Sequence, residues 1–382
     1  MLLASEPVMS YVLAFADTAH AAEHAAGSHP VASVLLRGYL IAWLFWLGVS
    51  LGGCALTWLH HLTGGKWGRA IRLELTAAGQ TLPLLAIGVI PILLNLPALY
   101  EWARPEVVAH DALLQKKALW LNTSFFAIRS VLYFVVWVAL GAWITQLRRK
   151  AQANPTFEHE HSLRFFSAMA LVVYGITVTL AAVDYSMSLE PHWYSGIYGV
   201  IYMVSQALAA LGFATAVGST RSASKDPAPF VTRDLGNLMM AFTMLWTYMN
   251  LSQFLIIWMG DLPEENVWYL HRLDAANGGW MWLALVLIFF GFAAPFLTLL
   301  SSAVKESRKF IGLVAIWIVV LRWFDIVWNV EPAFSKFDPA TLTSHAIVAA
   351  AMGAVWMVVF FWRRGALKND FPYEPPVAVE GH

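Results

Sequence analysis

The sequence is poor in cysteine and in charge. It has one cysteine, Cys54, among 382 residues, only 13% of its residues are charged, and the net charge is zero. A single cysteine excludes a disulfide framework, a thiolate zinc site and an iron–sulfur cluster held by this chain alone. Soluble domains carry about one quarter charged residues, so the composition argues against a soluble domain. The balanced charge argues against nucleic acid as a partner.

Motifs for common cofactors are missing as well. The sequence has no phosphate-binding loop, no glycine-rich dinucleotide motif and no H-E-x-x-H zinc motif. Bis-histidine haem needs imidazoles at matching depth on facing helices, and none of the 12 histidines lies deep in an apolar run. We therefore expect no metal and no firmly bound cofactor in this chain. A redox role would take its electron acceptor from a partner subunit.

Long apolar runs dominate what the sequence does contain. Hydrophobic residues make up 59% of it, and the mean hydropathy is +0.60. A transmembrane helix needs about 20 mostly apolar residues, and such runs lie at residues 39–61, 73–99, 118–147, 164–186, 194–217, 234–259, 279–301, 309–329 and 343–362. Strand-like alternation is absent. The sequence predicts an all-α polytopic membrane bundle, embedded in the lipid bilayer, with about nine transmembrane helices.

The two ends of the chain flank an integral membrane domain predicted over residues 35–363. Residues 1–34 are predicted to form an N-terminal tail. Its first 19 residues are mildly apolar, but Glu6 and Asp17 interrupt them, so a tenth helix there would be weak. Residues 364–382 are predicted to form a C-terminal tail.

Lysine and arginine in the connections predict the orientation, because cytoplasmic loops carry the excess of these residues. Sixteen of them follow spans one, three, five, seven and nine: Lys66, Arg69, Arg72, Arg148, Arg149, Lys150, Arg164, Arg221, Lys225, Arg233, Lys305, Arg308, Lys309, Arg363, Arg364 and Lys368. Six lie on the other side: Arg37, Arg104, Lys116, Lys117, Arg272 and Lys336. The C-terminus is therefore expected in the cytoplasm.

Two arginines, Arg129 and Arg322, fall inside predicted spans. A charge at mid-bilayer costs about 2.5–3.5 kcal/mol on insertion scales, so each needs a partner. Arg322, Asp325 and Asn329 follow at spacings that put them on one helix face. The expected partners of the two arginines are Asp184 and Asp325.

Other polar residues fall in or near the same outer half of the bundle, because the helices alternate in direction. The set comprises Arg129, Asp184, Gln253, Arg322, Asp325, Asn329 and His345, with His192 and Glu331 in short outer loops. Such a cluster can bind a polar ligand or transfer protons. The alternative is that the charges only lock helix packing. At the cytoplasmic side His60, His61 and Glu74 are candidates for proton entry.

Three stretches resemble one family. DYSMSLEPHWYSGIYGV, residues 184–200, resembles the ActF-type membrane subunit of bacterial alternative complex III, a quinol:cytochrome c or quinol:electron-acceptor oxidoreductase. That family usually has D-W-x-M-S-L-x-P-x-W-[FY]-S here, and this chain has Tyr185 at the second position. LHHLTGGKWGRAIR, residues 59–72, and NLSQFLIIWMGDLPEENVWY, residues 250–269, are similar to the same family.

The resemblance implies an NrfD-related fold of two four-helix bundles side by side in the bacterial inner membrane, with usually ten spans. It also implies a larger NrfD-like membrane subunit, a periplasmic iron–sulfur subunit and haem c subunits as partners. The ligand would be a quinol such as menaquinol, bound either by this subunit or by its larger relative.

Quinol oxidation releases two protons, so a site needs a proton acceptor and an apolar slot for the ring. Asp184, His192, Asp325 and His345 are the expected polar half. Met187, Trp193 and Tyr194 are the expected slot.

Two other functions fit the sequence. One is a scaffold for peripheral redox subunits, in which the buried charges are structural. The other is a secondary transporter, for which broken helices would be typical: Gly88 precedes Pro91, and Gly291 precedes Pro295, each by about one turn.

Overall fold

A computed structural model describes residues 30–221, 231–273 and 279–370. These residues form helices and connecting loops without strands. Nine helical segments of the described chain are long and apolar enough to cross a membrane: Ser33–Thr63, Lys66–Leu94, Thr123–Ala153, Phe157–Leu189, Tyr198–Ser219, Thr232–Gly260, Trp280–Leu300, Arg308–Ala333 and Pro339–Leu367. The predicted all-α membrane bundle is confirmed.

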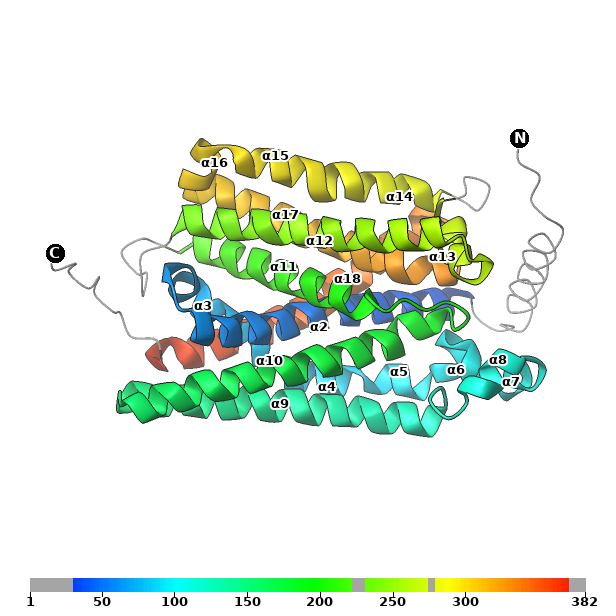
Figure 1. Cartoon of the computed structure of the whole chain (residues 1–382), viewed down its shortest axis with the longest axis horizontal. Helices are drawn as coiled ribbons and strands as arrows, with labels where there is room; N and C mark the ends of the chain where they lie inside the picture. Colours follow the sequence, from blue (N-terminus) through cyan, green and yellow to red (C-terminus); the bar gives the residue numbers. More distant parts are fainter. Residues whose placement is uncertain (1–29, 222–230, 274–278, 371–382) are drawn as a thin grey trace.

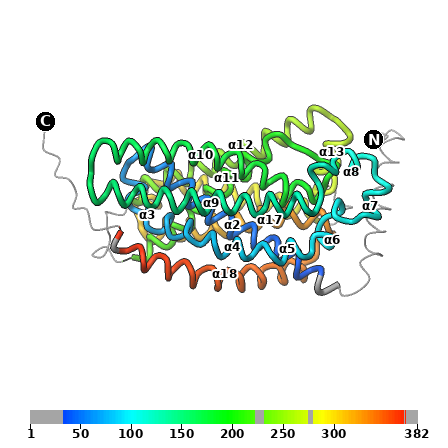
Figure 2. The backbone as a smooth tube through the Cα atoms, turned by 90° about the horizontal axis from the view of Figure 1, so that it is seen from below, coloured from blue at the N-terminus to red at the C-terminus, as the bar shows by residue number. Residues whose placement is uncertain are grey.

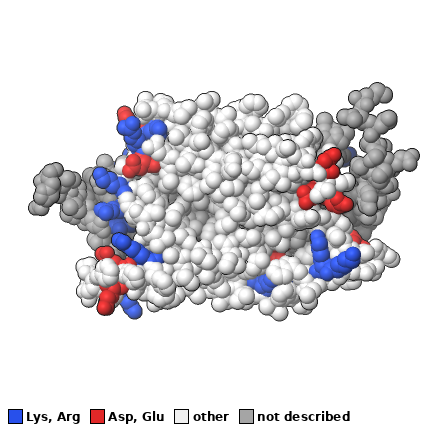
Figure 3. Space-filling view, viewed as in Figure 1, with Lys and Arg blue, Asp and Glu red and all other residues white. Residues whose placement is uncertain are grey.

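The helices run along one common axis, so the bundle has two ends (Figure 1). We call the end where α2 (Pro30–Thr63) begins the N-terminal end, and the end where α18 (Pro339–Leu367) finishes the C-terminal end. Charged side chains gather toward these ends and leave a broad uncharged belt between them (Figure 3). Exposed apolar side chains of the belt, such as Ile128 and Val358 at 63% and 71% exposure, suit contact with lipid.

We call two groups of four neighbouring spans the first and the second bundle. The first contains α2, α3 (Lys66–Gly79) with α4 (Leu82–Gly88), α9 (Thr123–Ala153) and α10 (Phe157–Tyr185). The second contains α11 (Tyr198–Ser219), α12 (Thr232–Gly260), α14 (Trp280–Val286) with α15 (Ala294–Leu300), and α17 (Arg308–Val330). Helix α11 packs on α10 as well, and as closely on α2 as on α17, so the two groups form one continuous core. Helix α18 packs on α2 and α3 along one edge of the molecule (Figure 2).

Helix α2 lies at the centre. In its most apolar stretch 94% of the residues are buried inside the protein. Gly52 lets α11 approach closely, because a Cβ at this position would lie only 2.2 Å from the Gln206 carbonyl oxygen. Trp46 of α2 stacks on Trp356 of α18, and Trp356 donates a hydrogen bond to Ser50. The first and last spans are therefore in direct contact.

Two spans are irregular, and both carry the glycine–proline pairs noted in the sequence. The second span breaks into α3, α4, α5 (Ile90–Leu94) and α6 (Leu96–Leu99), and a proline opens each of the last three pieces. Proline has no N–H to continue a helix. The seventh contains a π-helical stretch, η5 (Leu287–Ala293), just before Pro295.

Short helices cover the N-terminal end. They are η1 (Glu101–Ala103), α7 (Pro105–His110), α8 (Ala112–Lys117), η2 (Met187–Leu189), α13 (Pro263–Leu273) and η6 (Glu331–Ala333); α16 (Ser302–Glu306) and η7 (Lys368–Asp370) lie at the other end. Residues 1–29, including the weak tenth helix considered above, lie outside the described residues. The domain bounds differ slightly from the prediction, because α2 begins at Pro30 and α18 continues to Leu367.

Candidate functional site

The predicted pair of Arg129 and Asp184 is present and sealed between α9 and α10. Arg129 donates two hydrogen bonds of 2.8 Å to the two carboxylate oxygens of Asp184. Tyr133 and the Trp120 indole donate to the same carboxylate at 2.7 and 3.0 Å. The Arg129 guanidinium also donates a hydrogen bond to the backbone carbonyl of Trp120 and lies 4.1 Å from the centre of the Trp120 ring. Four donors thus satisfy a carboxylate that is 1% exposed.

The second predicted pair lies on α17. Arg322 Nη1 donates to Asp325 Oδ2 at 3.3 Å. Ser205 of α11 and Trp246 of α12 donate to the same oxygen at 3.0 and 3.1 Å. Asn329, one turn further along α17, donates to Asp325 Oδ1 at 3.5 Å. Asp325 therefore ties α11, α12 and α17 together inside the second bundle.

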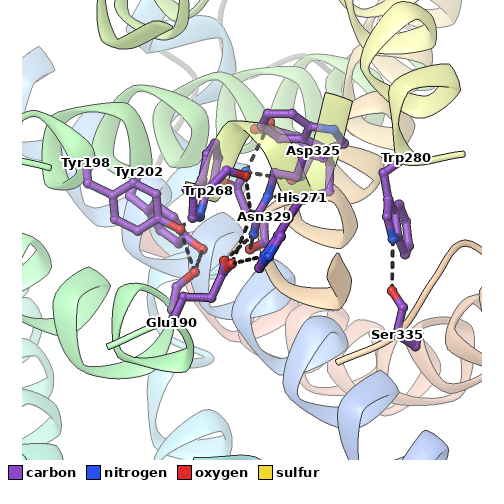
Figure 4. A network of polar contacts seen from close by, with 12 residues as sticks. Glu190, Tyr198, Tyr202, Trp268, His271, Trp280, Asp325, Asn329 and Ser335 are labelled. Carbon is purple, nitrogen blue, oxygen red and sulfur yellow. Dashed lines mark hydrogen bonds and ion pairs between the residues drawn. The ribbon is translucent and has the colours of Figure 1, made fainter. Parts of the chain in front are cut away.

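A chain of hydroxyl groups leads to this carboxylate (Figure 4). Tyr202 donates to Ser186 at 2.6 Å, Ser186 and Tyr198 share a hydrogen bond of 2.8 Å, and Tyr198 donates to Asn329 at 3.5 Å. Because Tyr198 donates to Asn329, Ser186 is the donor to Tyr198. The donors thus point in one direction, toward Asp325. Ser186, the second member of the chain, follows Asp184 by two residues in the sequence.

Arg272 of α13 closes the N-terminal end above these groups. It is fully buried, stacks 3.7 Å from the ring centre of Trp268 and pairs with Glu190 at 2.6 Å. It also donates to the carbonyls of Trp328 and Asn329, the last turn of α17, where helical carbonyls lack partners. Burial alone would raise the pKa of the Glu190 carboxyl, but Arg272, with a smaller contribution from His271, outweighs it and holds that pKa below its usual value.

A third buried set joins the first and last spans at the same end. Glu331 accepts from Arg37 of α2 at 3.0 Å and lies 2.9 Å from His345 Nε2 of α18. Ser335 also donates to Glu331 at 2.8 Å, and Trp280 donates to the Ser335 carbonyl (Figure 4). His345 is 0% exposed and lies near the start of α18.

The predicted outer residues therefore do not form one cluster. The structure divides them among the Asp184, Asp325 and Glu331 sets, each with its own arginine. Gln253 of α12 accepts from Ser195 and donates to Tyr269. His192 lies apart, 43% exposed, with its imidazole 2.7 Å from Asp111. Each buried charge pairs locally because an unpaired charge in the interior is costly.

The three cytoplasmic-side candidates make separate contacts at the C-terminal end. His60 bonds the Gly65 carbonyl, and His61 bonds Ser167 of α10. Glu74 is fully buried between helices, with Arg364 at 3.1 Å and Arg221 at 3.6 Å. The Glu74 carboxylate pairs inside the protein and does not extend to the surface. Of its two partners, Arg364 belongs to α18 and Arg221 follows the end of α11.

A hollow of about 380 Å³ opens at the N-terminal end between η1, α7, α8 and the start of α9. Its lining is mainly apolar and includes Trp102, Pro105, Val108, Ala118, Leu121 and Thr123; we call it the Trp102 hollow. Trp102 is 3% exposed, and its indole N–H has no hydrogen-bond partner among the described residues. The slot expected from the sequence is not this hollow, whose lining does not include Trp193 or Tyr194. Trp193 is packed against Trp268, and Tyr194 is 56% exposed.

Arg272 and Arg37 are not among the predicted site residues, because both fall outside the apolar runs of the sequence. Both are partners of buried carboxylates. One signal was available for Arg272: Trp268 precedes it by four residues, the spacing at which two side chains meet on one helix face.

Nine apolar spans, an uncharged belt and ion pairs sealed between helices define a polytopic α-helical integral membrane protein. Models of known protein families give no match to this chain, and a search of curated proteins gives none either.

Proposed function

We propose that this protein is a membrane subunit of a quinol-oxidising respiratory complex in the bacterial inner membrane, with its N-terminal end facing the periplasm. The Trp102 hollow would bind the quinol ring, and Asp184 would accept a proton. The resemblance at residues 184–200 supports the proposal that this subunit belongs to alternative complex III. Its partners would then be a larger NrfD-like subunit and periplasmic iron–sulfur and haem c subunits.

One observation carries the proposal: the hollow and the Asp184 pair share one chain segment. Trp120 donates to Asp184, and Leu121 to Thr123 line the hollow. Binding pockets of about 300–1,000 Å³ with apolar walls and few polar groups are typical of small-molecule sites. The indole N–H of Trp102 is buried without a protein partner in the described part of the chain, so it would become a donor for a ring oxygen when the side chain turns toward the hollow. The segment that lines the apolar hollow thus follows directly on Trp120, a hydrogen-bond donor to the Asp184 carboxylate.

The ring-binding step is tested by Trp102→Phe in the assembled complex. Loss of one hydrogen bond worth about 1 kcal/mol would raise the KM for quinol about fivefold and leave kcat nearly unchanged. Trp143→Phe is the matched control, because Trp143 is 43% exposed on α9 and lies outside the hollow. An unchanged KM in the Trp102 variant would contradict the assignment of the hollow.

The proton step is tested by the neutral double variant Arg129→Gln/Asp184→Asn, which removes the carboxylate without leaving a buried unpaired charge. We expect kcat or proton release to fall while the complex still assembles. A rise in KM alone would instead make the pair a positioning element for Trp120. Full activity with normal proton stoichiometry would refute the proposed role.

A scaffold function is the second candidate, favoured by the presence of an arginine partner in each of the carboxylate sets. In that case Arg322→Gln/Asp325→Asn and the Arg129/Asp184 double variant would both lower stability and leave quinol turnover unchanged. The same two assays therefore separate the two functions.

A further inference from the structure

Arg322 has more donors than its protein partners use. It is 1% exposed in the middle of the second bundle, with its guanidinium 3.6 Å from the ring centre of Trp246. Nη1 donates to Asp325, whereas Nε and Nη2 have no hydrogen-bond partner among the described residues. Next to Nη2 stands Gly291 of the π-helical stretch, where a Cβ would lie 3.2 Å from that nitrogen. No side chain of residue 291 therefore covers this edge of the guanidinium.

Unpaired donors of a buried cation are costly. Leaving a buried polar group unsatisfied costs about 1–3 kcal/mol, and more when the group is charged. Buried polar groups in folded proteins consequently almost always have a partner, and ordered water often provides it. The two nitrogens of Arg322 thus call for an acceptor.

A small cavity next to Arg322 has room for about one water molecule. Arg322 itself lines it, together with Gly48 of α2 and Tyr202, Ser205 and Gln206 of α11. A buried water needs two to four polar partners. The hydroxyl oxygens of Tyr202 and Ser205 can accept from it, because their protons already bind Ser186 and Asp325.

We infer that this cavity is a binding site for one ordered water, which accepts a hydrogen bond from Arg322 and donates to Tyr202 or Ser205. Gln206 also lines the cavity: its Oε1 accepts from Tyr174 of α10 at 2.9 Å, which leaves its amide N–H₂ as a donor. The water joins the Asp325 chain in the second bundle to the Gln206–Tyr174 pair in the first. The site requires no quinol and is independent of the proposed function.

The test uses Gly48→Ala, which adds a methyl group to the cavity wall, 3.2 Å from Gln206 Cγ. Gly141→Ala is the matched control, since a Cβ there meets nothing within 4 Å. Hydroxyl-radical footprinting with ¹⁸O-water mixing reports slowly exchanging buried water through labelling of nearby side chains, here Tyr202. We expect Tyr202 labelling in the native protein and in the control, and its loss in Gly48→Ala.

Equal labelling in the native protein and Gly48→Ala, or no Tyr202 labelling in the native protein, would overturn the site. If Gly48→Ala fails to fold, Ala209→Val fills the cavity from the α11 wall and gives the same test. A cryo-EM map with density between Arg322 and Ser205 would support the site, and a map that is empty there would exclude it. Neither measurement uses quinol turnover, so failure of the proposed function leaves the result interpretable.

Discussion

The Glu190–Arg272 pair offers the sharpest test of the energetic reasoning. Removing one partner of a buried pair typically costs about 3–5 kcal/mol. Glu190→Gln should cost the lower figure, about 3 kcal/mol, because Arg272 keeps its bonds to the carbonyls of Trp268, Trp328 and Asn329. Arg272→Met should cost more, since it strands a carboxylate together with the terminal carbonyls of α17.

The pH dependence of this pair has a definite sign. The pKa of Glu190 is lower in the folded protein than in the unfolded chain, so the carboxylate contributes stability above its unfolded pKa of about 4.3. That contribution is lost as the pH falls from there through the folded pKa. The native protein and Glu190→Gln should therefore differ by a constant amount above about pH 5 and converge in more acidic solution.

Thermal unfolding in nanodiscs, followed by tryptophan fluorescence, is the appropriate assay. The signal is the sum over the 19 tryptophans of the chain, Trp268 beside Arg272 among them, and so follows unfolding of the whole bundle. A stabilising role of the ionised Glu190 would be refuted by equal differences in melting temperature between the two proteins at pH 7 and pH 3.5. It would also be refuted if Glu190→Gln were as stable as the native protein at every pH.

Two further predictions concern the bundle. Asp184→Asn alone should lower the free energy of unfolding by about 3–5 kcal/mol, and adding Arg129→Gln should restore part of it; a double variant as unstable as the sum of the two single variants would contradict this. Gly52→Ala should disrupt folding, because its methyl group meets the α11 backbone. Gly141→Ala should instead raise the free energy of unfolding by up to about 1 kcal/mol through helix propensity. The yield of folded protein and the melting temperature check both substitutions.

Hydropathy predicted the number and order of the spans because the bilayer demands runs of about 20 apolar residues. It predicted the ends less well. Helix α9 continues to Ala153 and α10 begins at Phe157, so both extend several residues past the apolar runs, since polar side chains at helix ends are solvated. The partners of Arg129 and Arg322 were also predictable, because a charge inside a span must be neutralised.

The remaining site features depend on tertiary packing. Arg37 and Arg272 lie at sequence positions typical of solvated loops, and only the fold of the N-terminal end brings them against the carboxylates of Glu331 and Glu190. The Trp102 hollow is formed by helices of six residues or fewer and the start of α9, too short to leave a periodic pattern. The division of the outer polar residues into separate pairs likewise depends on how the helices are placed in space. The spacing of residues along one helix does not predict that placement.

The contact between Trp46 and Trp356 has a consequence for biogenesis. Helix α2 is synthesised well before α18, which covers part of it. During translation this helix is therefore solvated by lipid on faces that the finished protein encloses, and lipid must leave before the ring stack and the Ser50 hydrogen bond can form. This part of the core is sealed only when α18 has left the ribosome and inserted.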